Sequence, residues 1–437
     1  MVAGLPGVPV RKPVRMKPTR RRFLESTAGT ALGAFLLLNS CRKEADSRPS
    51  SAAGNDYADL DAVLAEPVLK RELFPDPVII DRLELLHLDG NYICRVTSTD
   101  GAEGLCVSNN MQMRHLYPIF TNRLQPFFPG KDARDWERLL EEVYVYQSNY
   151  KLQGLPLWVP LATIEFAVLD LLGKIARKPM GELIGEIHHP RIAIYQANNF
   201  RGHSVEESIE GIVRQVEETG ARAVKFKVGG RMSAPEEPPG RSEQLIPLVR
   251  QTFGDDMVIY ADSNGSYDVV EAIRIGKLME EYRYDFYEEP VPFDWYEETL
   301  QVADALDVPI AGGEQEPSLR NFRWLIHRGA LQVVQPDIFY FGGMIRSMKV
   351  ARMAAARGLT CTPHISGSGL GYLYMMHFVS ALPNAGPYHE FKGINRELPM
   401  TCPTSSLRSE NGTVQVPTGP GLGVEIDPDY VARHVVL

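Results

Sequence analysis

The chain has 437 residues, of which 44% are hydrophobic and 23% are charged, and its formal net charge is −9. This length and apolar content predict a globular protein with more than one domain. The negative charge argues against a nucleic-acid partner, which calls for a basic surface, and is compatible with an enzyme that acts on small molecules.

The first forty residues resemble an export signal. They carry seven basic residues and no acid before Glu25, and a short apolar stretch, STAGTALGAFLLLNS, follows. This order is typical of a secretory signal. Within TRRRFLE, Arg20 and Arg21 resemble the twin-arginine pair, and LLNSC resembles a lipoprotein processing site with Cys41 as the lipidated residue. We therefore expect a periplasmic or membrane-anchored protein, the alternative being a disordered basic tail.

The next two segments predict a tether and a small α+β domain. Residues 41–75 are mostly polar, which is typical of a linker. From residue 78 to 108, apolar runs are separated by LDGN and STDG, which predicts three antiparallel strands. Helical patterns follow over residues 132–148 and 160–185, so residues 76–190 form a capping domain. Cys94 and Cys106 flank the second turn, but a disulfide is not favoured, because twin-arginine export moves proteins folded in a reducing compartment.

From Arg191 onward, short strands alternate with helices. The helix over residues 204–218 has a capping box at its start, and Gly220 ends it. Eight strands are predicted over residues 191–392: Ile192–Gln196, the run around Lys225, Val258–Asp262, Asp285–Glu288, Pro309–Glu314, Leu331–Asp337, Leu359–His364 and Tyr388–Phe391. Eight such units predict a TIM-type (β/α) barrel, with a doubly wound sheet as the alternative. We expect residues 393–437 to return to the capping domain.

Ionisable residues stand at successive strand ends. The second strand carries two lysines, and the next strands end on an acid or a histidine at intervals of 23 to 27 residues: Lys225, Lys227, Asp262, Glu288, Glu314, Asp337, His364 and Glu390. In a barrel these strand ends converge on the active site. Three converging carboxylates without a cation would be costly, and an all-oxygen donor set favours Mg²⁺. Glu289 and Glu316 are alternative metal ligands.

These motifs resemble the enolase superfamily, and within it the mandelate racemase subgroup. KFK is similar to the KxK motif, with Lys227 as the base. Asp262, Glu288 and Glu314 are similar to the triad that holds one Mg²⁺ per subunit, and Asp337 with His364 is similar to the Asp–His dyad. The segment PDIFYFGG after the sixth strand has no lysine, which favours this subgroup over the muconate-lactonizing one.

The resemblance also implies roles in substrate binding. Glu390 matches the acid near the substrate carboxylate, Asn264 falls where subgroup members place a substrate contact, and Lys225 contacts the carboxylate. Lys225 would also lower the pKa of Lys227 by repulsion. The members of this family are often symmetric oligomers, which implies a homo-oligomer here.

The implied reaction is Mg²⁺-dependent removal of the proton α to a carboxylate, through an ene-diolate. The leading interpretation is a lyase that dehydrates an acid sugar to a 2-keto-3-deoxy acid. The alternative is an isomerase, a racemase or epimerase of a hydroxy or amino acid. A non-catalytic exported carbohydrate-binding lipoprotein is a remote third, because a binding protein has no use for two opposed bases.

Overall fold

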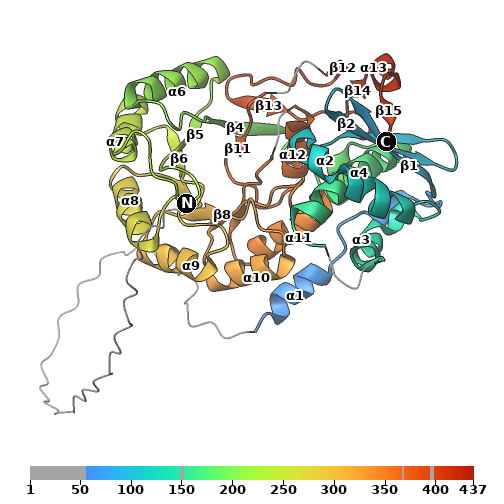
Figure 1. Ribbon diagram of the computed structural model, residues 1–437, viewed down its shortest axis with the longest axis horizontal. Coiled ribbons are helices and arrows are strands. Elements are labelled where there is room, and N and C mark those ends of the chain that lie inside the picture. Colours follow the sequence, from blue (N-terminus) through green and yellow to red (C-terminus); the bar gives the residue numbers. More distant parts are fainter. Residues whose placement is uncertain (1–55, 148–151, 367–368, 394–397) are drawn as a thin grey trace, which may run out of the picture. The chain divides into compact units, whose positions relative to one another are not determined.

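The computed structural model describes residues 56–147, 152–366, 369–393 and 398–437, which belong to one compact unit, residues 48–437 (Figure 1). The predicted signal, with Arg20, Arg21 and Cys41, lies outside the described residues, so its interpretation stays a prediction.

A four-stranded antiparallel sheet with the order β15-β1-β2-β3 forms the core of the capping domain. Its three N-terminal strands are β1 (Ile80–Leu88), β2 (Asn91–Ser98) and β3 (Glu103–Val107), which confirms the predicted meander. Cys94 and Cys106 are directly opposed across β2 and β3 and are both free and buried. Their neighbouring positions confirm that the two cysteines lie close together.

Helices complete the capping domain. They are α2 (Asn110–Ile119), α3 (Trp136–Val145), α4 (Leu155–Ala176) and α5 (Met180–Ile184), joined by the short helical turns η2 (Phe120–Leu124), η3 (Gln125–Phe127) and η4 (Ala133–Asp135). Among the described helices, α4 alone is long and apolar enough to cross a membrane, but 89% of its most apolar window is buried in the protein. It packs on β2 and β3 of this sheet, and a Cβ at Gly104 of β3 would lie 2.1 Å from the carbonyl oxygen of Ala167. The helix is therefore part of the core.

The second part of the chain is the predicted eight-stranded barrel. Its strands are β4 (Arg191–Ala197), β5 (Ala223–Lys227), β6 (Val258–Asp262), β7 (Phe286–Glu288), β8 (Ile310–Gly312), β9 (Val333–Val334), β10 (Thr360–Cys361) and β11 (His389–Glu390). All neighbouring pairs are parallel, and the first strand, β4, pairs with the eighth, β11. At the remaining gap, Cys361 of β10 forms a parallel bridge with Ala385, just before β11, which closes the barrel and rules out the doubly wound alternative.

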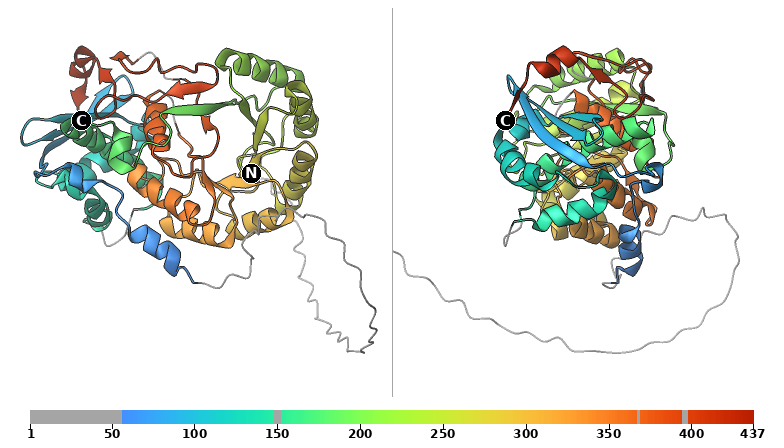
Figure 2. Two further views of the ribbon diagram at one scale, coloured as in Figure 1. Left: turned by 180° about the vertical axis from the view of Figure 1, so that it is seen from behind. Right: turned by 90° about the vertical axis from the view of Figure 1, so that its right-hand side faces the viewer.

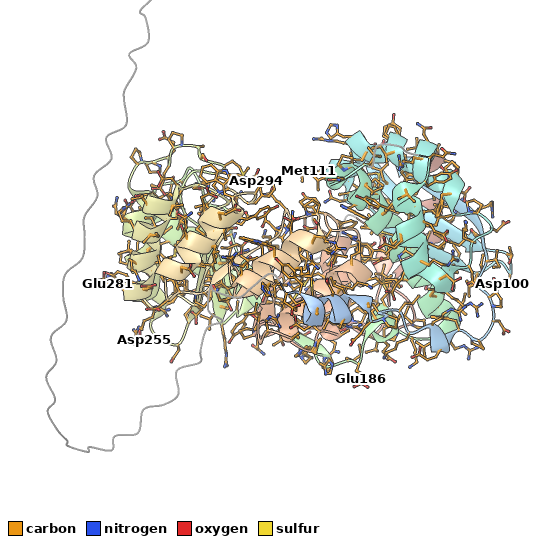
Figure 3. All side chains as sticks on the ribbon, turned by 90° about the horizontal axis from the view of Figure 1, so that it is seen from below. Asp100, Met111, Glu186, Asp255, Glu281 and Asp294 are labelled. Carbon is orange, nitrogen blue, oxygen red and sulfur yellow. The ribbon has the colours of Figure 1, made fainter. Side chains whose placement is uncertain are left out.

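Helices follow one another around the outside of these strands (Figure 1). They are α6 (Val205–Thr219), α7 (Arg241–Phe253), α8 (Val269–Glu281), α9 (Tyr296–Ala305), α10 (Leu319–Arg328), α11 (Met344–Ala355) and α12 (Leu370–Ser380). The capping box of α6 forms between Ser204 and Glu207, and Gly220 adopts the left-handed conformation that ends the helix. Figure 3 places Asp255 and Glu281 at the barrel end of this unit and Asp100 at the capping-domain end.

The C-terminal segment contacts both parts. It contains β12 (Met400–Thr401), β13 (Thr413–Gln415), β14 (Glu425–Ile426), α13 (Pro428–Ala432) and β15 (Val435–Val436). β13 pairs with β4 of the barrel, and β15 pairs with β1 of the capping sheet. Figure 2 shows this red segment running from the barrel to the capping domain. The expected return of the tail to the capping domain is therefore seen.

The structure corrects the predicted tether. Within residues 41–75, α1 (Ala58–Ala65) and η1 (Arg71–Leu73) are folded, and Leu60, Val68 and Leu69 are buried. Lys349 of α11 donates to the carbonyl of Leu64 over 2.9 Å. Basic side chains also bind this arm, residues 56–75, since Arg323 pairs with Asp61 and Arg357 pairs with Asp59. Local sequence does not reveal such distant partners.

Candidate active site

Strand alternation sends the predicted residues into the mouth of the barrel. The barrel interior is filled by a cluster that includes Ala223, Tyr260 and Phe286. Side chains two residues apart share a face of a strand, so the face of Ala223 continues to Lys225 and Lys227. In the same way, Tyr260 shares a face of β6 with Asp262, and Phe286 shares a face of β7 with Glu288. The two lysines and the first two acids are therefore inward-facing residues at the carboxyl ends of β5, β6 and β7.

Asp262, Glu288 and Glu314 form the cluster that the sequence predicts. One carboxylate oxygen from each lies within 4.8 Å of the others, and all three residues are buried. Burial and the neighbouring charge of Asp262 raise the pKa of Glu288 to about 7. Three crowded carboxylate oxygens with no thiol or imidazole among them suit a hard divalent cation. The cluster can therefore hold a metal ion.

Each lysine of the KFK motif faces a carboxylate of this cluster. Lys225 Nζ lies 2.8 and 2.7 Å from the two oxygens of Glu288, and Lys227 Nζ contacts Asp262 Oδ2. Although burial disfavours its charged form, Glu288 holds the pKa of Lys225 well above its usual range. Lys225 is buried, whereas the Lys227 side chain is 18% exposed. Lys227 is thus the more exposed lysine at the barrel mouth, while both oxygens of Glu288 engage Lys225.

The Asp–His dyad forms on the other side of the cluster. Asp337 Oδ2 lies 2.7 Å from His364 Nδ1, and Asp337 Oδ1 accepts from the backbone amides of Phe339 and Tyr340. The carboxylate is thereby fixed, and it orients the ring so that Nε2 faces the acidic cluster. His364 Nε2 lies 3.5 Å from Glu314 Oε2. Lys227 and His364 therefore contact different members of the acidic cluster.

Acidic neighbours surround His364. Although burial opposes its charged form, Glu314, Asp337 and Glu390 raise the pKa of His364 to about 10. Glu390, at the end of β11, has Oε2 3.9 Å from His364 Nε2. Glu390 thus lies beside the dyad at the barrel mouth, where the sequence predicts it.

Asn264 also lies at the site, but its side-chain amide is already engaged. Its Oδ1 accepts from Arg201 Nη1 over 3.1 Å, and its Nδ2 lies 3.3 Å from Glu289 Oε2. Its φ of 44° places it in the left-handed region that asparagine tolerates. A substrate contact through Asn264 stays a prediction and would have to share or replace these partners.

Comparison with known proteins agrees with this geometry. Residues 208–430 match the family model described as enolase C-terminal domain-like, and all the predicted site residues fall inside that match. The chain belongs to this family.

Relatives place it within the mandelate racemase subgroup of the enolase superfamily. The chain is 27% identical to arabinonate dehydratase of Saccharolobus solfataricus, over 69% of this chain and 79% of the relative. It is 27% identical to D-galactarolactone cycloisomerase of Agrobacterium fabrum, over 70% and 81%. A mandelate racemase/muconate lactonizing protein from Paracoccus denitrificans, solved with magnesium, superimposes with a TM-score of 0.73 at 27% identity, covering 82% of this chain and 99% of that one.

Two alternative ligands of this enolase superfamily member have other roles. Glu316 accepts from Tyr296 Oη and from the backbone amide of Ser318, the N-cap residue of α10, so it is held at the start of that helix. Glu289 is buried and bonds Asn264, and it is not part of the three-acid cluster within the described residues. The acids that begin the EEP and EQE motifs, Glu288 and Glu314, are therefore the ones that converge.

Sequence reasoning missed two supporting residues. Gln335 is buried and donates to Glu288 Oε2 over 2.8 Å. Its position two residues before Asp337, just past β9, is the signal that could have found it. Arg201 donates to the carbonyls of Val228 and Asp262 as well as to Asn264. Nothing local marks Arg201, because its partners come from later strands.

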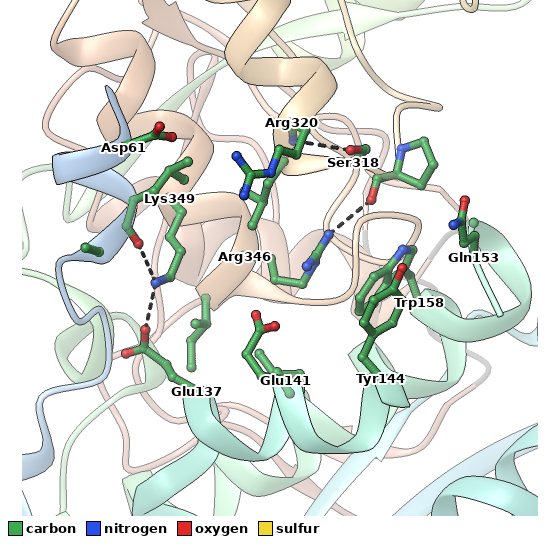
Figure 4. A pocket seen from close by; sticks show the side chains of 17 residues that line it. Asp61, Glu137, Glu141, Tyr144, Gln153, Trp158, Ser318, Arg320, Arg346 and Lys349 are labelled. Atoms are coloured by element: carbon green, nitrogen blue, oxygen red, sulfur yellow. Dashed lines mark hydrogen bonds and ion pairs between the residues drawn. The ribbon is translucent and has the colours of Figure 1, made fainter. Parts of the chain in front are cut away.

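A cavity of about 780 Å³ lies elsewhere in this superfamily member, between α1, α3 and the outer barrel helices (Figure 4). Lys349 bridges the carbonyl of Leu64 and Glu137, and Arg346 donates to the carbonyl of Pro317. The Arg346 guanidinium lies 3.7 Å from the ring centre of Trp158. None of the predicted site residues lines this cavity, which is where the arm docks.

Proposed function

We propose that the protein removes the proton α to the carboxylate of an acid sugar and dehydrates the sugar to a 2-keto-3-deoxy acid. The observation that carries this proposal is the placement of two proton carriers against one acidic cluster. Lys227 contacts Asp262, and His364 lies 3.5 Å from Glu314. A substrate carbon between them can lose a proton to one group and receive a proton from the other. The relatives named as an arabinonate dehydratase and a cycloisomerase support the substrate class.

We propose one Mg²⁺ ion per subunit, held by Asp262, Glu288 and Glu314. Their three buried carboxylate oxygens fit this ion, and a structural relative was solved with magnesium. When bound, Mg²⁺ offsets the negative charge that develops on the substrate carboxylate as the proton leaves. Gln335 keeps Glu288 oriented from behind.

The protein's own residues supply the proton transfers. Lys227 is the partly exposed member of the lysine pair and acts as the base at the α-carbon. His364, oriented by Asp337, gives a proton to the departing β-hydroxyl. Loss of the hydroxyl as water leaves an enol, which tautomerises to the keto acid. If His364 instead returns a proton to the α-carbon, the product is the epimer, and this second candidate rests on the same two opposed groups.

Incubation with Mg²⁺ and a panel of sugar acids in D₂O tests the proposal. We expect one acid to give a keto acid, which is detected as its semicarbazone. We also expect the unreacted part of that acid to gain deuterium at its α-carbon. Deuterium in an epimer without keto acid would support the racemase or epimerase instead. The proposed function is wrong if the protein binds no Mg²⁺ and exchanges the α-proton of no acid.

We further propose that the protein is exported, carries a lipid at Cys41 and forms a homo-oligomer. The twin-arginine-like TRRRFLE and the LLNSC motif support the first two. Expression with labelled palmitate, comparing the natural chain with Cys41→Ser and with Arg20→Lys/Arg21→Lys, tests both. Unlabelled natural protein in the cytoplasm would contradict both. Light scattering of the purified protein tests the oligomeric state, and a monomer would contradict the third proposal.

A further inference from the structure

The cavity between α1, α3 and the outer barrel helices contains a buried arginine without an acidic partner. Arg346, in the first turn of α11, is 9% exposed. Its Nε donates to the carbonyl of Phe341 over 2.7 Å, and its Nη2 donates to the carbonyl of Pro317 over 3.0 Å. Its third nitrogen, Nη1, has no acceptor among the described residues, and no described carboxylate lies within 4.0 Å of the guanidinium.

A cation in this position is costly, because burial removes water from the guanidinium without supplying a counter-charge. Burial lowers the pKa of Arg346 to about 10, and the more distant charges of Glu141 and Glu165 oppose this shift only in part. The ring of Trp158 lies 3.7 Å from the guanidinium and compensates for some of the lost water. Arg346 is therefore charged at neutral pH and has no anion beside it among the described residues.

The other charged side chains that line the cavity do not supply that anion. They are Asp61, Glu137, Glu141, Arg320 and Lys349. Asp61 pairs with Arg323 of α10, and Glu137 lies 3.1 Å from Lys349 Nζ. Arg320 is exposed and makes no ion pair with any described residue. Two guanidinium groups, those of Arg320 and Arg346, therefore face one carboxylate, that of Glu141, which leaves a surplus of one positive charge.

The size and lining of the cavity suit a small organic anion. Its volume of about 780 Å³ lies in the range of small-molecule sites. The first turns of α10 and α11 border it, and the positive ends of their dipoles add to the attraction for an anion. Figure 4 shows Arg320 and Glu141 on opposite sides of Arg346. An ionised Glu141 only accepts hydrogen bonds, so it suits a hydroxyl group and repels a second negative charge.

We propose that this cavity binds a small hydroxycarboxylate, with its carboxylate on Arg346 and Arg320 and a hydroxyl group on Glu141. A single negative charge balances the surplus of the lining, whereas the second charge of a dianion such as sulfate would face Glu141. The site lies apart from the barrel mouth, and the inference does not depend on the proposed function. The bound molecule contacts α1, α3 and α11 together, so it stabilises the docking of the arm.

Calorimetric titration of the whole chain with D-gluconate in EDTA tests the proposal. We expect one site per chain and a Kd that Lys227→Met, at the barrel mouth, leaves unchanged. Arg320→Gln should raise this Kd about tenfold or more, because it loses a charged hydrogen bond. Arg346→Lys should do the same, because it loses the planar fork of donors. The matched control is Arg214→Gln on α6, an exposed arginine that lines no part of the cavity.

Four results would overturn the proposal. The first is the absence of saturable binding below about 10 mM gluconate, which is too weak for a built site. The second is loss of binding in Lys227→Met, which would place gluconate at the barrel mouth. The third is a Kd that neither Arg320→Gln nor Arg346→Lys changes by more than Arg214→Gln does. The fourth is binding of the neutral polyol sorbitol, or of sulfate, as tightly as gluconate.

Hydrogen exchange followed by mass spectrometry needs no variant. Gluconate should slow exchange of the amides of α1 and α3 several-fold, because both helices line the cavity. Exchange in α6 and α8, which do not line it, should be unchanged. Slowing that is confined to the barrel-mouth segments, or equal in all helices, would contradict binding in this cavity.

Discussion

Glu165 offers a test of the packing between the capping domain and the barrel. It lies on α4, where Oε2 accepts from Trp136 Nε1 over 2.8 Å and Oε1 accepts from the backbone amide of Ile345 at the start of α11. A Cβ at Gly343 would lie 2.1 Å from Oε1, so the carboxylate fits closely against that turn. Burial raises the pKa of Glu165 from 4.5 to about 7, while these two hydrogen bonds oppose the shift.

The shift gives stability a definite dependence on pH. Because the folded protein binds the Glu165 proton more tightly than the unfolded chain, the contribution is complete below pH 4.5 and is lost as pH rises through about 7. The difference of about 2.5 pKa units corresponds to about 3 kcal/mol. Glu165→Gln removes this titration and separately leaves one of the two N–H donors without its acceptor.

Urea unfolding between pH 4.5 and 8 measures the effect. We expect the free energy of unfolding of the natural protein, relative to Glu165→Gln, to fall by about 3 kcal/mol across this range. The matched control is Glu186→Gln, which makes the same charge change at an exposed position (Figure 3). A difference between the natural protein and Glu165→Gln that stays constant with pH, or that rises, would refute the reasoning.

Three further variants test the metal site, the dyad and the core. Asp262→Asn should weaken Mg²⁺ binding, measured by calorimetry, by about tenfold or more, because loss of even an outer-shell partner of a metal has an effect of that size. An unchanged Mg²⁺ affinity would contradict the assignment of Asp262 as a metal ligand. Asp337→Asn should slow keto-acid formation about 10²-fold or more because His364 loses its orientation, whereas α-deuteration should be retained. Loss of both keto-acid formation and α-deuteration would show that Lys227 and His364 do not act separately. Gly104→Ala should lower the free energy of unfolding by about 1–3 kcal/mol, because its Cβ would meet the Ala167 carbonyl, and an unchanged melting temperature would contradict that contact.

The barrel and most of its site could be predicted because their signals are local. Each βα unit has an apolar strand and a helix, and an ionisable residue such as Asp262 or Asp337 stands where the strand ends. Once the units are counted, barrel closure brings those ends together whatever the details of packing. The pairing of β4 with β11 and the grouping of Asp262, Glu288 and Glu314 agree with that logic.

The folded arm could not be predicted in this way. Its helix, α1, lies in a polar segment, and partners such as Lys349 lie more than 280 residues further along the chain. The partners of Asn264 likewise come from different loops, Arg201 after β4 and Glu289 after β7. Contacts of this kind depend on the paths of loops and on strand register, neither of which leaves a periodic pattern.

The amino-acid order alone predicts which side chains converge, since strand alternation and unit spacing dictate what reaches the barrel mouth. Tertiary structure decided how those side chains are paired. Lys225 faces Glu288, Lys227 faces Asp262, and Lys392 faces Glu390. Charge pairing depends on distances of a few ångströms between separate strands, and only the closed barrel sets those distances.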